Sequence, residues 1–154
     1  MNSKRRIVMF FFLALTVTGG LFASPVSGLR TLTPPGELVV DPDRTVLVFY
    51  SSTCPFCHDL MNWVRQVQHN FPDIEFQYLE VVNSNSPERQ EYFQAVMDIY
   101  GSGAQGVPRT IIGDQLFIGF AQDSMESRFL PQHNGWFGSR LAIMRALQEM
   151  QSRW

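Results

Sequence analysis

Residues 45–71 read TVLVFYSSTCPFCHDLMNWVRQVQHNF and place two cysteines between two apolar patterns. The run from Val46 to Tyr50 is β-branched, aliphatic or aromatic without polar alternation, which predicts a strand buried on both faces. Behind the cysteines, apolar residues recur at helical spacing and predict a helix with one buried side. These residues are Leu60, Val64, Val67 and Phe71. The cysteine pair therefore lies at the start of the predicted helix.

The spacing Cys54-Pro55-Phe56-Cys57 is typical of thiol–disulfide chemistry. The first turn of a helix carries unpaired N–H groups and the positive end of the helix dipole, and both favour thiolate over thiol. We therefore predict Cys54 as the attacking sulfur and Cys57 as the sulfur that breaks the resulting mixed disulfide. Pro55 suits the first helical turn. Phe56 should be exposed and offer a substrate chain an apolar contact.

The composition indicates one domain with a real core, since 45% of the 154 residues are hydrophobic and 13% are aromatic. A net charge of −2, with acids and bases scattered, gives no sign of a nucleic-acid surface. Both cysteines of the chain lie in the motif, so no thiol is left for a separate structural disulfide. We predict a redox-active Cys54–Cys57 disulfide; the alternative is a small stabilising loop disulfide.

The N-terminus has the layout of a secretory signal. Lys4, Arg5 and Arg6 precede an apolar run over residues 7–22, which is followed by Ala23-Ser24-Pro25. We predict export, to the periplasm, with residues 1–23 as a cleaved signal peptide. The alternative is an uncleaved membrane anchor over residues 7–23.

Residues 24–36 are rich in Pro, Gly, Ser and Thr and are predicted to be a tether, which leaves residues 37–154 as the domain. The remaining elements are predicted as a short strand over 37–40, a strand over 74–82, a helix over 87–100, a hairpin over 110–120, a short helix at 123–129 in an irregular segment, and a closing helix over 139–151. A strand, a helix and a strand in this order imply a parallel crossover. The predicted class is therefore α/β, with a central mixed sheet, built from a parallel β-α-β unit and a C-terminal β-hairpin, flanked by helices.

This order of elements resembles the thioredoxin superfamily over residues 46–120 and the last helix. Two separated motifs carry the resemblance: the cysteine pair, and Gly106-Val107-Pro108 just before the hairpin, which is similar to the family's cis-proline loop. The resemblance implies a thioredoxin-like fold and a thiol–disulfide oxidoreductase that needs no cofactor or metal. It also implies a cis Val107–Pro108 bond that leaves the Val107 backbone beside Cys54 to pair with a substrate peptide.

Within the superfamily, Val107-Pro108-Arg109 and Ile118-Gly119 resemble glutaredoxins, and the exported thioredoxin-like and DsbA-like proteins are at least as similar. On this resemblance Arg109 helps to shape substrate selectivity. Glutaredoxins usually carry a lysine three residues before the first cysteine, where this chain has Ser51. They also carry a pair of acidic residues after the last strand, where this chain has the single acid Asp123. The resemblance therefore gives no support for glutathione as a partner.

Protein thiols and disulfides are the substrates that the resemblance implies, together with a membrane-bound or soluble redox partner. Thioredoxin and DsbA share this motif yet differ in reduction potential by about 150 mV. The motif therefore leaves open whether the protein works as an oxidase, a reductase or an isomerase.

Two other functions use the same residues. Cys54-Pro55-Phe56-Cys57-His58 is also C-x-x-C-H, the attachment pattern of c-type haem in electron carriers. Alternatively, Cys54, Cys57 and His58 could serve as ligands in a metal-binding or metal-delivery module.

Overall fold

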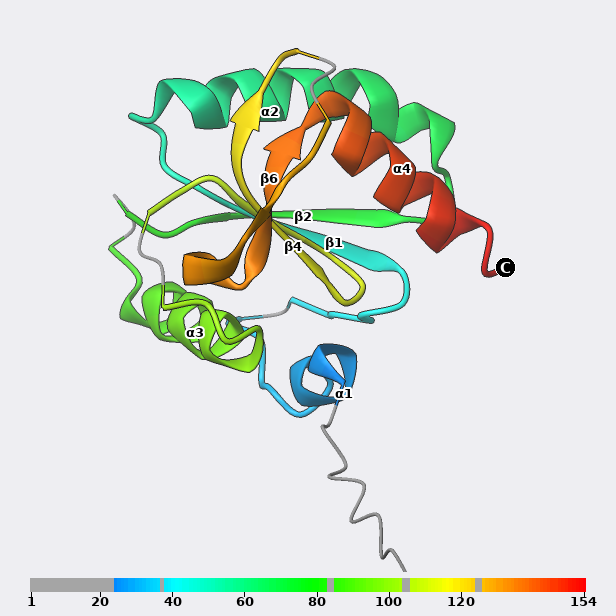
Figure 1. The fold of residues 1–154 in the computed structure, drawn as a ribbon. Coiled ribbons are helices and arrows are strands. Elements are labelled where there is room, and N and C mark those ends of the chain that lie inside the picture. The colour runs from blue at the N-terminus through cyan, green and yellow to red at the C-terminus, as the bar shows by residue number, and fades with distance from the viewer. Residues whose placement is uncertain (1–23, 37, 83–84, 104–105, 124–125) are drawn as a thin grey trace, which may run out of the picture.

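The structure, a computed structural model, describes residues 24–36, 38–82, 85–103, 106–123 and 126–154 (Figure 1). The signal peptide or anchor predicted over residues 1–23 lies outside this part of the chain. Six strands form one sheet in the order β2-β1-β3-β4-β6-β5. The strands are β1 Thr45–Tyr50, β2 Glu75–Glu80, β3 Arg109–Ile112, β4 Gln115–Ala121, β5 Phe129–Leu130 and β6 Gly135–Ser139. The helices are α1 Pro25–Leu29, α2 Pro55–Val67, α3 Pro87–Ile99 and α4 Arg140–Gln151, with short 3-10 turns at Gln68–Asn70 and Pro131–His133.

The central strand β1 pairs in parallel with β2 and antiparallel with β3, so the sheet is mixed. Helix α2 connects β1 to β2, and β3 and β4 form a hairpin around Gly113. Helices α2 and α4 cover one face of the sheet, and α1 and α3 cover the other (Figure 1). The predicted α/β class with a thioredoxin-like mixed sheet is confirmed.

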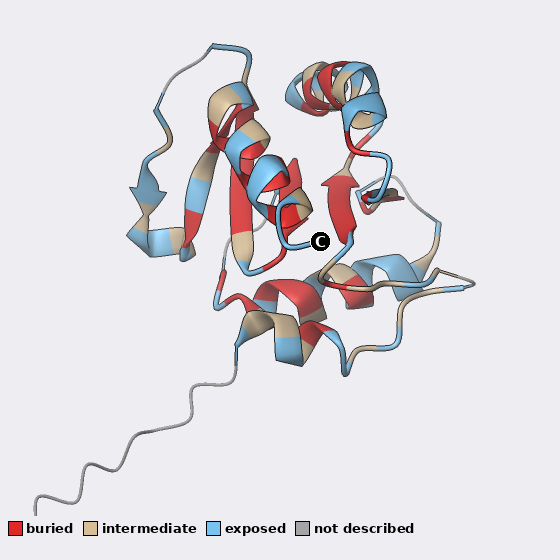
Figure 2. Cartoon of the chain, turned by 90° about the vertical axis from the view of Figure 1, so that its right-hand side faces the viewer, coloured by how far each residue is buried: buried red, intermediate tan, exposed pale blue. Residues whose placement is uncertain are grey.

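The side chains of β1 alternate between two apolar cores. Val46 and Val48 pack toward α2 and α4, whereas Leu47 and Phe49 pack toward α1 and α3. All four are at most 1% exposed, and Figure 2 shows the buried residues gathered where the helices meet the sheet. An uninterrupted apolar strand is what burial on both faces requires, and its C-terminal end delivers the chain to the cysteines.

The sequence prediction was wrong for the segment after β4. Instead of an irregular stretch with a short helix at 123–129, the chain forms β5 and β6, and residues 126–128 have no helical structure. Strand β6 pairs in parallel with β4. Glycine is depleted in strands, so Gly135 and Gly138 concealed β6 from a pattern-based prediction. The short strand predicted over 37–40 is also absent, since residues 38–40 form no strand.

The prediction of a tether over residues 24–36 is wrong for residues 25–29. Residues 25–29 form α1, whose Leu29 is 3% exposed and packs into the core that α3 shares with the sheet. Glycine at position 28 lets α1 lie close to α3, because a Cβ added there would be 3.0 Å from the Ile99 side chain. In the described part of the chain, no helix has the length and apolar character needed to cross a membrane.

Replacing Leu29 by alanine is expected to lower the free energy of unfolding by about 2 kcal/mol, because a buried leucine loses its apolar contacts. Urea denaturation measures the change. Ser27→Ala in the same short helix is the matched control, since Ser27 is exposed and exposed substitutions usually stay within about 0.5 kcal/mol. Equal stability of the two variants would show that α1 does not pack on the domain.

Candidate active site

Cys54 is the residue that caps the N-terminus of α2. Its backbone is extended, with φ −92° and ψ 116°, and its Sγ accepts a hydrogen bond of 3.3 Å from the N–H of Cys57. Pro55 follows at the first helical position, where a missing N–H leaves no hydrogen bond unmade. Cys54 is partly exposed, so its sulfur is accessible and lies at the positive end of the helix dipole.

Cys57 lies in the first turn of the same helix, and it is fully buried. Burial is the main reason why its pKa is raised to about 12, and a hydrogen bond with the Cys54 side chain adds to the rise. A hydrogen bond with the Ser51 backbone opposes both effects. Both cysteines are free thiols, so the structure represents the reduced state, in which Cys57 keeps its proton at neutral pH.

The loop before β3 brings a distant segment to the cysteines. The Val107–Pro108 peptide bond is cis, the form that the resemblance to the thioredoxin superfamily implies. Cys54 Sγ lies 3.7 Å from the carbonyl oxygen of Val107, 53 positions away in the sequence. Gly106 has a φ of 111°, a conformation that suits glycine. Cys54 and the backbone of the cis-proline loop therefore lie side by side.

The other residues predicted to bind substrate differ in their access to solvent. Phe56 is 61% exposed between the two cysteines, and Pro55 is exposed, Val107 half-buried and Pro108 buried. Arg109 is only 5% exposed, and burial lowers its pKa. Because it is buried in β3, Arg109 offers a substrate little accessible surface in this structure, and its role in selectivity stays a prediction.

The loop Ser51–Thr53 has two side-chain contacts that the sequence analysis missed. His58 Nε2 lies 2.6 Å from the Ser52 carbonyl oxygen, and the Ser52 N–H donates to Glu80 at 2.9 Å. Hydrogen bonds from the side chain and the backbone N–H of Ser52 lower the pKa of the Glu80 carboxyl group. No local pattern marks Glu80, since its position depends on the register of β2 against β1.

The geometry does not favour the haem or metal alternatives. Covalent haem attachment uses both sulfurs of C-x-x-C-H, whereas Cys57, in the first turn of α2, is 0% exposed. His58 directs Nε2 to the Ser52 carbonyl. Within the described ranges, no three His, Cys, Asp or Glu side chains are grouped so that they could hold a metal ion.

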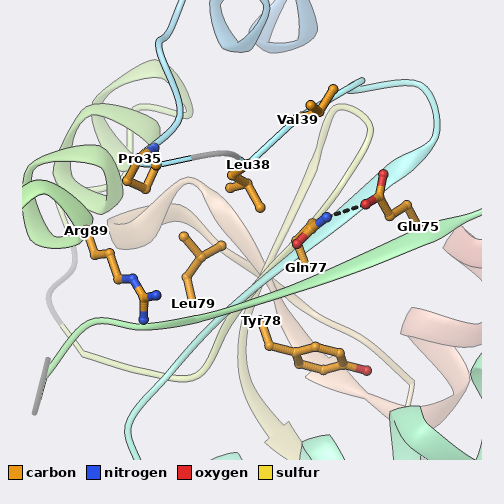
Figure 3. Close-up of a pocket in the computed structure, with 9 residues that line it drawn as sticks. Pro35, Leu38, Val39, Glu75, Gln77, Tyr78, Leu79 and Arg89 are labelled. Carbon is orange, nitrogen blue, oxygen red and sulfur yellow. Dashed lines mark hydrogen bonds between the residues drawn. The ribbon is translucent and has the colours of Figure 1, made fainter. Parts of the chain in front are cut away.

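A pocket of about 440 Å³ lies between the segment around Pro35, the edge strand β2 and α3 (Figure 3). Gln77 and Glu75 are hydrogen-bonded along its rim, and Arg89 lies at its α3 side. None of its lining residues belongs to the cysteine motif or to the cis-proline loop. This cavity is therefore separate from the surface around Cys54.

Comparisons with known proteins identify the same region. The glutaredoxin family model matches residues 46–117, which include both cysteines and the Val107–Pro108 bond. Glutaredoxin-1 of Rattus norvegicus is 32% identical over 103 residues, which cover 67% of this chain and 86% of the rat protein. No solved structure matches the chain significantly.

Proposed function

Because the chain belongs to the glutaredoxin family, we propose that it is an exported oxidoreductase that exchanges disulfides with protein substrates through Cys54 and Cys57. Family membership supports thiol–disulfide redox chemistry in general. The observation that carries the proposal for this chain is the contrast between the two sulfurs. Cys54 is partly exposed and 3.7 Å from the Val107 carbonyl oxygen, while Cys57 is buried behind it.

In the proposed reaction, the Cys54 thiolate attacks one sulfur of a substrate disulfide. A Cys54–substrate bond forms, the substrate S–S bond breaks, and the second substrate sulfur leaves as a thiolate. Cys57 then attacks Cys54 Sγ and gives its proton to the departing substrate thiolate. The protein ends with a Cys54–Cys57 disulfide and the substrate with one thiol and one thiolate, which takes a proton from water. Two electrons thus pass to the substrate. The reverse sequence of steps oxidises a dithiol substrate.

An extended substrate segment is proposed to dock beside the cysteines by pairing with the Val107 backbone, as an added strand does. Phe56 supplies an apolar contact next to the reacting sulfurs, supported by its 61% exposure. Pro55 and Pro108 shape this surface from either side of Cys54. Backbone pairing together with one aromatic contact suits unfolded or loop segments of proteins.

Glutathione is not part of the proposal. Ser51 stands where glutaredoxins usually carry a lysine, and it is a neutral side chain that is 2% exposed. It offers no charge for a small anionic thiol, so a membrane-bound or soluble protein is proposed as the redox partner.

Export to the periplasm is proposed from the basic and apolar pattern of residues 1–23. Determining the N-terminus of the protein recovered from the periplasm and from the membrane fraction tests this. A mature N-terminus near Ser24 would support a cleaved signal, and an intact N-terminus in the membrane fraction would support an anchor. Recovery from the cytoplasm alone would contradict export.

Cys57→Ser is expected to accumulate mixed disulfides between Cys54 and substrate proteins, because the first attack proceeds and the second is blocked. Non-reducing electrophoresis should show higher-mass species that collapse on addition of dithiothreitol, and mass spectrometry should locate the bond at Cys54. Cys54→Ser and the double variant are the matched controls and should trap nothing. Absence of any trapped species from Cys57→Ser, or equal trapping by Cys54→Ser, would contradict the proposed function.

A further inference from the structure

The peptide groups of Ser52 are held by side chains from two different elements. His58, in α2, lies 2.6 Å from the Ser52 carbonyl oxygen through Nε2, and Glu80, at the end of β2, accepts the Ser52 N–H at 2.9 Å. A carbonyl oxygen only accepts, so Nε2 carries the proton in this contact. His58 is exposed and Glu80 partly exposed, so core packing does not account for either side chain being here.

Ser51, the residue before Ser52, contacts both cysteines through its backbone. Its carbonyl oxygen accepts a hydrogen bond of 3.2 Å from the N–H of Cys54. Its backbone also hydrogen-bonds Cys57 in the direction that favours the ionised sulfur. A shift of the Ser52 peptide would therefore move Ser51 relative to the two sulfurs.

We propose that His58 and Glu80 are positioning residues that clamp Ser52 and thereby set the reduction potential of the Cys54–Cys57 pair. The inference rests on the proposed function, because it concerns the equilibrium between the dithiol and the disulfide of the same site. Neither side chain touches a reacting sulfur. Both act through the Ser51 backbone.

The expected direction follows from the reduced structure. In this state the clamp holds Ser51 in its hydrogen bonds with Cys54 and Cys57. Loosening Ser52 weakens the Ser51 hydrogen bond with the Cys57 sulfur. That bond favours an electron-rich, reduced sulfur, so its loss shifts the equilibrium toward the disulfide and the potential becomes more negative. Loss of about one net hydrogen bond corresponds to about a fivefold change in the equilibrium constant.

The test measures the fraction of Cys54–Cys57 disulfide in defined dithiothreitol redox buffers, by alkylation and mass spectrometry. His58→Leu and Glu80→Ala are each expected to shift the equilibrium constant about fivefold toward the disulfide, which is about 20 mV at 29.6 mV per tenfold. His58→Gln retains an N–H donor and should stay within about twofold of the wild type. His69→Leu, at an exposed histidine beyond the end of α2, is the matched control and should leave the constant unchanged.

The clamp would be overturned if His58→Leu and Glu80→Ala both stay within twofold of the wild type, or if His58→Gln shifts as far as His58→Leu. In either case the proposed function is still supported if the Cys54–Cys57 pair of the wild type equilibrates normally with the redox buffer. A wild-type protein that forms no Cys54–Cys57 disulfide in any buffer would instead overturn the proposed function, and the clamp with it.

Discussion

Gly138→Ala is expected to lower the free energy of unfolding by about 3 kcal/mol or more, the upper range for forcing extra atoms into a packed site. A Cβ built on Gly138 would lie 2.2 Å from the carbonyl oxygen of Gly119, a backbone atom of β4. This clash is relieved only if β4 and β6 move apart. Their parallel pairs at Ile118 with Phe137 and at Ala121 with Ser139 lie on either side of this contact.

Urea denaturation at neutral pH measures the loss, and Gly103→Ala is the matched control. Gly103 has no positive φ to accommodate, and among the described residues no atom lies within 4 Å of its built Cβ. Its variant should remain within about 0.5 kcal/mol of the wild type. If the two alanine variants are equally stable, β4 and β6 do not approach as closely as described.

Gly138→Ala should also change the geometry of the active site. The Gly119 N–H donates a hydrogen bond of 3.0 Å to the carbonyl oxygen of Pro108, so β4 supports the cis-proline loop directly. Displacing Gly119 therefore displaces Val107 relative to Cys54. Strand β6, which contacts no residue of the cysteine motif in the sheet pairing, thus contributes to the geometry of the substrate surface.

The sequence was sufficient for the elements whose evidence is local. The apolar run of β1, the cysteines and the amphipathic pattern of α2 are contiguous, and each favours the structure that its neighbours require. The juxtaposition of Cys54 with Val107 was predictable only because two separated motifs together resembled a known superfamily. Spacing alone does not bring those two segments together.

The features that escaped prediction depend on contacts between distant residues. Gly138 looks unsuited to a strand until the approach of the Gly119 carbonyl shows why no side chain fits. Arg109 is of a type that is almost always exposed, yet its place in β3 leaves it 5% exposed. Leu29 lies in a turn-rich composition, and only the surface offered by α3 makes its burial favourable.

The reduced protein is expected to lose stability in alkali through Cys57. Its pKa rises from 9.0 to about 12 on folding, mainly because burial disfavours the thiolate. A group with a raised folded-state pKa contributes its full stabilisation below the unfolded value. That contribution is lost as pH rises from 9 toward 12. At 1.36 kcal/mol per pKa unit, the loss is about 3 kcal/mol by pH 11 and about 4 kcal/mol when complete.

Cys57→Ala tests this effect, because it removes the titrating thiol and leaves the ionisable groups outside the cysteine motif in place. Burial also raises the pKa of Tyr92 to about 12 and raises that of Tyr100, but these tyrosines titrate in both proteins and cancel in the comparison. Urea denaturation under reducing conditions at pH 8, 9, 10 and 11 should show the wild type losing about 3 kcal/mol more than Cys57→Ala. Parallel stability curves would mean that Cys57 ionises as readily in the folded protein as in the unfolded chain. A buried Cys57 could not then be the proton-holding partner that leaves Cys54 as the attacking sulfur.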